Sequence, residues 1–397
     1  MKDDNIRRLR LNRLSLTKDG CDLDAFRALV ERTVNPSDYP YASEVASNVL
    51  IYEGDAVRKA AASPETRREI MAEWLDALTD GPGIVVFRKA FADVAPIEAS
   101  NALYWAMIDE QHRSNSARGD HFAKPGANDR VWNALEKLCL ADPAAFAAYY
   151  GNEVIALISE ARLGPAYQIT SQLNVVNPGG EAQIPHRDYH MGFQTESEIE
   201  RFPIHAHRLS PMLTLQGAVA HCDMPLETGP TLYLPFSQTY LPGYLAALRD
   251  DFRAYFADHK VQLPLKTGDA AFFNPAVFHG AGTNHSKDIK RIANLLQVST
   301  AYGRAMESVD RLKMSVALYP ILKTHLVSKT MTPEAIDNTV AASAEGYAFP
   351  TNLDRDPAIG GLAPQSQASL MRQALKEGWT ADAFTKAAEA QAWRKLT

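Results

Sequence analysis

The sequence predicts an α+β fold, in which an antiparallel β sandwich or barrel occupies the middle of the chain and helical segments flank it. Helical signals dominate residues 20–80 and return after residue 305. Between about 166 and 300, short β-rich runs alternate with Pro, Gly and Asn, a texture typical of sandwiches and barrels. The expected organisation is a helical extension, a β domain and a second helical extension, at residues 1–80, 81–303 and 304–397.

The part before the β-rich region carries both helix and strand signals. Ser63-Pro64-Glu65 supplies an N-cap residue, a proline at the first helical position and an acid in the first turn, and Gly81 ends this helix. The further elements expected here are a buried strand at 83–87, a helix at 97–111, a polar loop at 113–129, and helices over 130–141 and on to residue 150.

The β domain and the C-terminal part follow from the same reasoning. Short runs rich in β-branched and aromatic residues are expected to form strands at 167–176, 212–220, 231–234, 261–265, 270–273 and 292–300. Thr332-Pro333-Glu334 and Thr380-Ala381-Asp382 have the composition of helix starts. These two motifs predict helices in the C-terminal extension.

Composition excludes several classes of function. The 397 residues are 46% hydrophobic and 22% charged, an ordinary globular balance, and the net charge is −6. A negative chain without basic clusters is not expected to bind nucleic acid or an anionic membrane. The three cysteines form no CxxC motif, and the charged N-terminus lacks the apolar run of a signal peptide. We therefore expect a soluble cytoplasmic protein with a small-molecule substrate, while its oligomeric state is not predicted.

Three residues have the pattern of a two-histidine, one-carboxylate iron site. His186 and Asp188 are two positions apart, so an extended backbone places both on one side, and Pro185 favours that conformation. His279 follows the apolar run 270–273 and an Asn-Pro turn. Such a site binds a divalent metal on one face and leaves the other face open. The alternative for His186 is a loop histidine bonded to a neighbouring backbone carbonyl.

Arg291 suggests what kind of molecule binds together with the metal. It begins the apolar run 292–300 and follows His279 by one glycine-rich turn, HGAGTN. Charged residues rarely begin a buried strand unless something pairs with them, and an arginine fork suits a carboxylate. A 2-oxo diacid fits both features, because one end chelates iron while the far carboxylate meets the arginine. The alternative is a surface cation beside Lys287 and Lys290.

Several blocks resemble, in order, those of the phytanoyl-CoA dioxygenase family of iron(II)- and 2-oxoglutarate-dependent oxygenases. They are GIVVFRKAF, IPHRDYH, AVAHCDMPLETGPTLYLPFSQ, GDAAFFNPAVFHGAGTN and Arg291, over roughly residues 80–303. The resemblance implies a double-stranded β-helix (jelly-roll, cupin-like) core. It also implies that His186, Asp188 and His279 are catalytic metal ligands for Fe(II), and that Arg291 binds 2-oxoglutarate.

The chain also departs from the family pattern. Ala218 stands where the family often has a tryptophan, so another residue is expected to form that wall of the pocket, and Gln216 on the same face is a candidate. Gln172 and Asn174 share a strand face and are candidates for binding 2-oxoglutarate, or else ordinary strand residues facing water. For His190, which makes the pattern HxDxH, a role beside the ligands is favoured over direct ligation.

The resemblance implies a dioxygenase that uses Fe(II), 2-oxoglutarate and O2 to hydroxylate or otherwise oxidise a C–H bond, with release of succinate and CO2. Because Asp188 is present, oxidation is expected rather than halogenation. The competing interpretation is a metal-binding cupin-like protein without oxygenase activity, such as a hydrolase, an isomerase or a binding module. The polar segments 112–130 and 191–208 are expected to form lids over the site. The identity of the substrate does not follow from the sequence.

Overall fold

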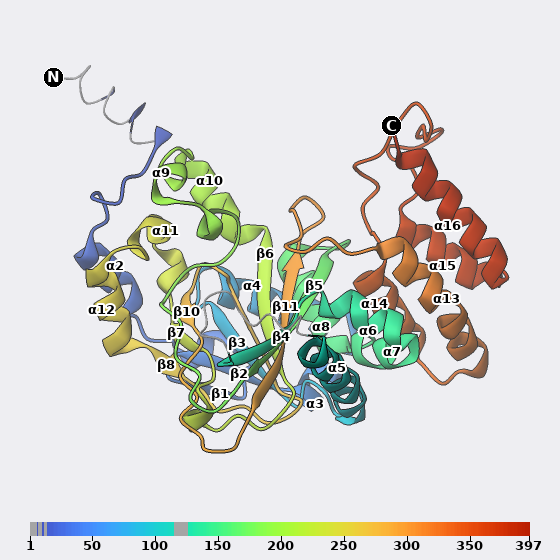
Figure 1. Cartoon of the computed structure of the whole chain (residues 1–397). Helices are drawn as coiled ribbons and strands as arrows, with labels where there is room; N and C mark the ends of the chain where they lie inside the picture. Colours follow the sequence, from blue (N-terminus) through green and yellow to red (C-terminus); the bar gives the residue numbers. More distant parts are fainter. Residues whose placement is uncertain (1–5, 7–9, 12–13, 115–125) are drawn as a thin grey trace. The chain divides into compact units, whose positions relative to one another are not determined.

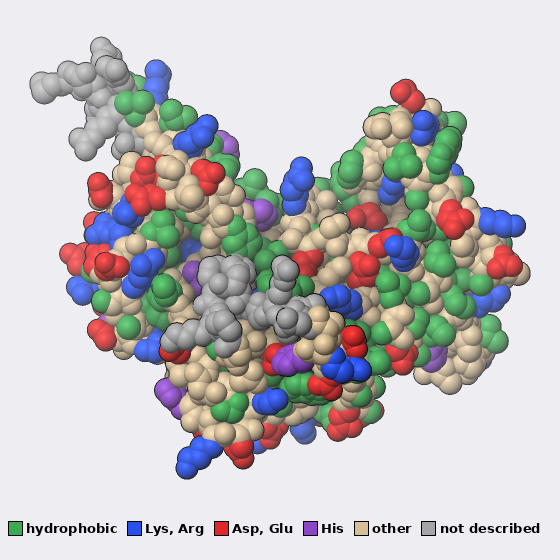
Figure 2. All heavy atoms as spheres, in the orientation of Figure 1, with side chains coloured by type: hydrophobic (Ala, Val, Ile, Leu, Met, Phe, Trp, Pro, Cys, Tyr) green, Lys and Arg blue, Asp and Glu red, His purple; other side chains and the backbone are tan. Residues whose placement is uncertain are grey.

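The computed structural model describes residues 6, 10–11, 14–114 and 126–397 (Figure 1). The chain forms two compact units, and each is considered by itself. The first unit takes in residues 1–92, 118–129 and 174–295, and the second takes in residues 93–117, 130–173 and 296–397. In Figure 2, basic and acidic side chains are interspersed over the displayed face of the described residues, and neither sign of charge covers a large area.

A mixed eight-stranded sheet forms the framework of the first unit. Its strand order is β1-β2-β3-β9-β6-β11-β5-β4. The strands are β1 (Glu44–Ala46), β2 (Val49–Glu53), β3 (Ile84–Arg88), β9 (Ala270–Phe273), β6 (Thr214–Ala220), β11 (Arg291–Ser299), β5 (Gln168–Val176) and β4 (Asn128–Val131). Strands β2 and β3 are parallel, whereas β1–β2, β3–β9 and β6–β9 are antiparallel. Strands β4, β5 and β11 each continue into the second unit.

A smaller antiparallel sheet lies against this framework. It has the order β10-β7-β8, with β10 (Phe278–Gly280), β7 (Leu232–Leu234) and β8 (Val261–Gln262). A core of buried apolar side chains joins the two sheets: Val49, Ile51 and Val86 come from the large sheet, and Tyr233 from the small one. The rings of Tyr233 and Phe273 meet edge to face, with centroids 5.0 Å apart. The two sheets therefore bury their facing sides against each other.

Helices cover the outer side of each sheet in the first unit. Phe278 of β10 belongs to a second core, shared with α2 (Leu23–Val30), α11 (Gly243–Ala246) and α12 (Asp250–His259). Its ring lies 5.2 Å from that of Phe26. On the large sheet, Trp74 of α4 packs edge to face on Phe87 of β3. The remaining helices of this unit are α3 (Gly54–Ala61), α4 (Pro64–Thr79), α9 (Glu196–Ile199) and α10 (Ile204–Leu209).

The second unit is mainly helical. Its helices are α5 (Ala95–Arg113), α6 (Ala134–Ala141), α7 (Pro143–Tyr150), α8 (Glu153–Leu163), α13 (Arg311–Ser328), α14 (Pro333–Ser343), α15 (Gln367–Glu377) and α16 (Ala381–Lys395). Thr332 and Thr380 cap α14 and α16, as their positions in the sequence predict. The rings of Tyr319 and Phe384 stack between α13 and α16 at 4.2 Å. Among the described helices, none is long and apolar enough to cross a membrane.

The α+β class is confirmed, and the structure corrects three element predictions. Residues 44–53, expected among helices, form the β1–β2 hairpin, whose turn residues Ser47 and Asn48 have φ of 51° and 64°. Positive φ at both central residues is the geometry of the tight turns that match strand twist. Residues 128–131 form strand β4, so the helix expected from residue 130 begins at Ala134. His279 lies within strand β10 and not in a turn after a strand.

Candidate metal centre

Backbone pairing brings the two halves of the predicted iron motif together. The amide of His186 donates to the carbonyl of His279 at 3.0 Å, and the amide of His279 donates to the carbonyl of His186 at 3.2 Å. The amide of Asp188 donates to the carbonyl of Pro275 at 3.0 Å. The segment that carries the first two predicted ligands is thus fixed beside the strand that carries the third.

The three predicted ligand side chains converge. One ligand atom each from His186, Asp188 and His279 lies within 4.8 Å of the others, the only such group of metal-ligating residues in the described chain. His186 Nε2 is 3.4 Å from Asp188 Oδ1, and His279 Nε2 is 3.3 Å from Asp188 Oδ2. Two imidazole nitrogens therefore flank one carboxylate, each on a different oxygen.

The hydrogen bonds of the two imidazoles fix which nitrogen faces the carboxylate. His186 Nδ1 contacts the carbonyl of Ile184, and His279 Nδ1 contacts that of Val277, both at 2.8 Å. A carbonyl only accepts, so each Nδ1 must carry a proton. In the neutral imidazole, Nε2 then presents a lone pair to a carboxylate that is itself an acceptor. A cation between these groups would turn mutual repulsion into coordination, and this orientation of histidine is the usual one in metal sites.

Asp188 is held in its charged form. Burial opposes its ionisation, but a hydrogen bond from His279 in its protonated form, the positive charge of both imidazoles in that form, and the amide of Gln216 together leave its pKa below the usual range. A proton on Nε2 thus stabilises the carboxylate in the way that a metal cation would. Gln216 Nε2 donates to Asp188 Oδ2 at 2.6 Å. Gln216 Oε1 is buried without a hydrogen-bond partner among the described residues. The structure thus places Gln216, predicted as part of the 2-oxoglutarate pocket, directly beside a predicted ligand.

Arg187, between the two ligands of the turn, was not singled out by sequence reasoning. Its side chain is buried, and Nη2 donates to the carbonyls of Ser237 and Tyr240 at 2.5 and 2.9 Å. Burial lowers its pKa to about 10. A Cβ atom at Gly243 would lie only 1.9 Å from the Arg187 guanidinium carbon. The turn that carries His186 and Asp188 is therefore tied to the start of α11, where only a glycine leaves room for the Arg187 side chain.

Arg291 is buried, with 6% of its surface exposed, so the surface alternative is wrong. Its Nη1 donates to the carbonyls of Thr228 and Gly282 at 3.1 and 3.5 Å. Among the described residues no carboxylate forms an ion pair with it, and burial lowers its pKa to about 10. Its charge also acts on the phenol of Tyr233, whose strand pairs with that of His279. A buried cation with only carbonyl partners suits an anionic ligand.

The remaining predicted site residues have other surroundings. Gln172 and Asn174 are buried, so neither faces water as the alternative assumed. Gln172 Oε1 accepts from Arg130 at 3.0 Å within the second unit. His190 Nδ1 lies 3.3 Å from Ser210 Oγ, and His190 is not one of the three converging residues. A role for His190 beside the ligands stays a prediction. Residues 115–125 of the expected first lid lie outside the described residues, and the second segment contains α9 and α10.

Comparison with known proteins identifies one matching family. The model of the phytanoyl-CoA dioxygenase family matches residues 66–292, more than half of the chain. That range contains His186, Asp188, His279 and Arg291. No curated protein matches the chain.

Solved structures give weaker similarities. The non-heme α-ketoglutarate-dependent epimerase SnoN from nogalamycin biosynthesis is 20% identical, with a TM-score of 0.40 over 60% of this chain and 85% of that one. The carbocyclase SnoK from the same biosynthesis is 19% identical, with a TM-score of 0.41 over 60% and 84%. AviO1 from Streptomyces viridochromogenes Tue57 is 17% identical, with a TM-score of 0.41 over 59% and 96%. Similarities of this size add nothing to the family match.

Proposed function

The chain belongs to the phytanoyl-CoA dioxygenase family, and from that membership we propose that it is an Fe(II)- and 2-oxoglutarate-dependent dioxygenase acting on a small molecule. The observation that carries the proposal is the orientation of His186 and His279, whose Nε2 atoms both face the Asp188 carboxylate while each Nδ1 donates to a backbone carbonyl. In this assignment the two facing sheets are the layers of a double-stranded β-helix.

Each of the proposed site residues has its own role in such an enzyme. His186, Asp188 and His279 hold the metal on one face, and Arg291 pairs with the distal carboxylate of 2-oxoglutarate. Gln216 orients Asp188 through its amide hydrogen bond. Bound iron, with 2-oxoglutarate and O2, supplies the oxidation of a substrate C–H bond, with succinate and CO2 as co-products. Because Asp188 is kept as the third ligand, we expect hydroxylation or another oxidation of the C–H bond rather than halogenation. Hydroxylation would be recognised by one added oxygen atom in the product.

The metal centre is tested by anaerobic addition of Fe(II) and 2-oxoglutarate to the full-length protein. Wild-type protein is expected to develop the visible charge-transfer band of the iron–2-oxoglutarate chelate, because three protein ligands leave room for a bidentate co-substrate. His186→Ala is expected to abolish the band. His285→Ala is the matched control, since this exposed histidine follows the same glycine turn. No band in wild type, or an undiminished band in His186→Ala, contradicts the site.

The role of Arg291 separates the proposed oxygenase from a metal-binding protein without oxygenase activity. Arg291→Ala is expected to weaken 2-oxoglutarate binding at least about tenfold while iron affinity changes little, because a charge-assisted pair is lost and no ligand is touched. Titration of 2-oxoglutarate into iron-loaded protein, followed by the same band, measures this. Lys287→Ala, which removes a nearby exposed cation, is the control. Equal loss of iron and 2-oxoglutarate would show that Arg291 is only structural.

A further inference from the structure

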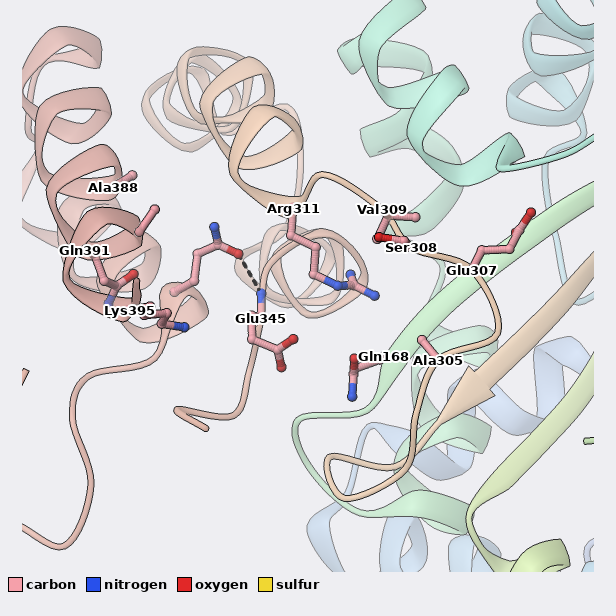
Figure 3. A pocket seen from close by; sticks show the side chains of 12 residues that line it. Gln168, Ala305, Glu307, Ser308, Val309, Arg311, Glu345, Ala388, Gln391 and Lys395 are labelled. Carbon is pink, nitrogen blue, oxygen red and sulfur yellow. Dashed lines mark hydrogen bonds between the residues drawn. The ribbon is translucent and has the colours of Figure 1, made fainter. Parts of the chain in front are cut away.

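The second unit contains a cavity of about 340 Å³ that none of the metal-site residues lines (Figure 3). This volume is at the small end of the range for ligand pockets. Arg311 of α13 and Glu345 lie in the middle of the view, with Gln391 and Lys395 of α16 on one side and Gln168 of β5 on the other. The lining thus carries side chains of both charges together with neutral amides.

Arg311 is fixed by carbonyl groups but keeps part of its donor set. Its Nη1 donates to the carbonyls of Ala342 and Ser343, at 3.3 and 3.4 Å. Its Nη2 donates to the carbonyl of Ile169 at 3.0 Å. A guanidinium has five N–H groups, and these contacts use neither Nε–H nor both hydrogens of Nη2. Nε and Nη2 share one edge of the guanidinium, and such an edge can bind a carboxylate with two parallel hydrogen bonds.

Glu345 lines the same cavity without pairing with that arginine. Its amide donates to Gln367 Oε1 at 2.8 Å, which fixes its backbone, and Oε1 accepts from the amide of Tyr347 at 3.2 Å. Among the described residues, neither Glu345 nor Arg311 takes part in an ion pair. The charge of Glu345 nevertheless acts on Arg311 and partly offsets the lowering of its pKa by burial. The two opposite charges therefore lie at one cavity without direct contact.

Buried amides complete the lining. Gln391, with 2% of its surface exposed, donates from Nε2 to the carbonyl of Gln365 at 2.7 Å, so its Oε1 is available to accept a hydrogen bond. Gln367, with 8% exposed, accepts through Oε1 and so keeps its Nε2 group. Glu307, also at the cavity, points away from Arg311 in Figure 3, and its Oε1 accepts from the amide of Asn133 at 2.7 Å.

We propose that this cavity binds a small zwitterion of the α-amino-acid type, with its carboxylate on the free edge of Arg311 and its ammonium group on Glu345. Such a ligand neutralises both side chains at once, whereas a simple acid or a simple amine pairs with only one. The cavity volume is sufficient for an amino acid. The site is independent of the metal centre, because no predicted iron or 2-oxoglutarate residue lines it.

The test is calorimetric titration of the full-length protein with each common L-amino acid, up to about 10 mM. Acetate and ethylammonium serve as probes that carry only one kind of charge. At least one amino acid is expected to bind wild-type protein more tightly than both probes. Glu345→Gln, which keeps the shape of the side chain, is expected to weaken that binding at least about tenfold, because a charge-assisted contact is lost. Arg311→Lys, which lacks the fork, is expected to weaken it as well.

Two matched variants make the result specific. Glu389→Gln makes the same chemical change on an exposed position of α16 and is expected to leave binding unchanged. His186→Ala is also expected to leave it unchanged, which separates this site from binding of an amino acid as a substrate at the metal centre. The proposal is overturned if no amino acid binds, if Glu345→Gln behaves like Glu389→Gln, if His186→Ala abolishes binding, or if acetate binds as tightly as the amino acid.

Discussion

At the scale of single residues, the metal centre depends on groups that the sequence motif does not contain. Spacing identified His186, Asp188 and His279, which the structure brings together. Their orientation comes from the carbonyls of Ile184 and Val277, which no side-chain pattern shows. The alternative considered for His186, a histidine bonded to a nearby carbonyl, describes the same contact that directs its other nitrogen towards Asp188. A structural hydrogen bond through Nδ1 and metal binding through Nε2 are therefore compatible roles for His186.

Gln216 offers a test of how orientation affects metal binding. Gln216→Leu removes the 2.6 Å hydrogen bond to Asp188 and is expected to lower Fe(II) affinity about tenfold, the usual effect of losing a partner of a ligand. Unfolding stability is expected to change little, because the wild-type amide already leaves Oε1 buried without a partner. Competition with a metal-sensitive dye measures the affinity. Gln172→Leu is the control, and equal affinity in both variants would exclude a positioning role.

At the scale of elements, local composition predicted strands well where they are bounded by turn residues. Strands β5, β6, β7, β9 and β11 lie within or close to their predicted ranges. The β1–β2 hairpin was missed because it lies among helices, although its residues Val49-Leu50-Ile51-Tyr52 and the Ser-Asn turn carry a strand signal. Strand β10 has only three residues, too few to form a pattern, and its pairing with β7 depends on distant sequence.

At the start of α11, the turn that carries His186 and Asp188 requires a residue without a side chain. Gly243→Ala is expected to lower the free energy of unfolding by about 1–3 kcal/mol, because the added methyl group must displace the Arg187 guanidinium. Helix propensity alone would make alanine stabilising at this position, so a loss of stability in Gly243→Ala would show that the contact with Arg187 outweighs propensity. Urea denaturation compares it with Gly361→Ala, where the nearest atom to a new Cβ lies 3.7 Å away. Equal stability of the two variants would show that the guanidinium moves freely.

At the scale of the whole molecule, metal binding is expected to stabilise one of the two units and not the other. All three predicted ligands belong to the first unit, while α13–α16 belong to the second. A metal at about a hundred times its dissociation constant adds about 2.7 kcal/mol to the stability of the folded state that binds it. We therefore expect anaerobic Fe(II) to slow hydrogen exchange in β7 and β10.

Hydrogen-exchange mass spectrometry with and without Fe(II) measures the effect on each strand. The α13–α16 segment is expected to be unaffected, because it contributes no ligand to the converging group. In His279→Ala the protection of β7 and β10 should disappear. Protection that is as strong in α13–α16 as in β10, or that persists in His279→Ala, would place the metal elsewhere.

Neighbouring side chains of β10 face opposite sides of the strand, and this affects how the chain can be shortened. Phe278 and His279 are neighbours, yet one is packed against Phe26 of α2 while the other faces the Asp188 carboxylate. The segment that matches the family begins at residue 66, after α2 and after β2, which pairs with β3. A fragment cut at that boundary would keep every proposed ligand but lose the aromatic support behind one of them. We therefore expect the minimal folding unit to begin before the segment that matches the family, early enough to include α2.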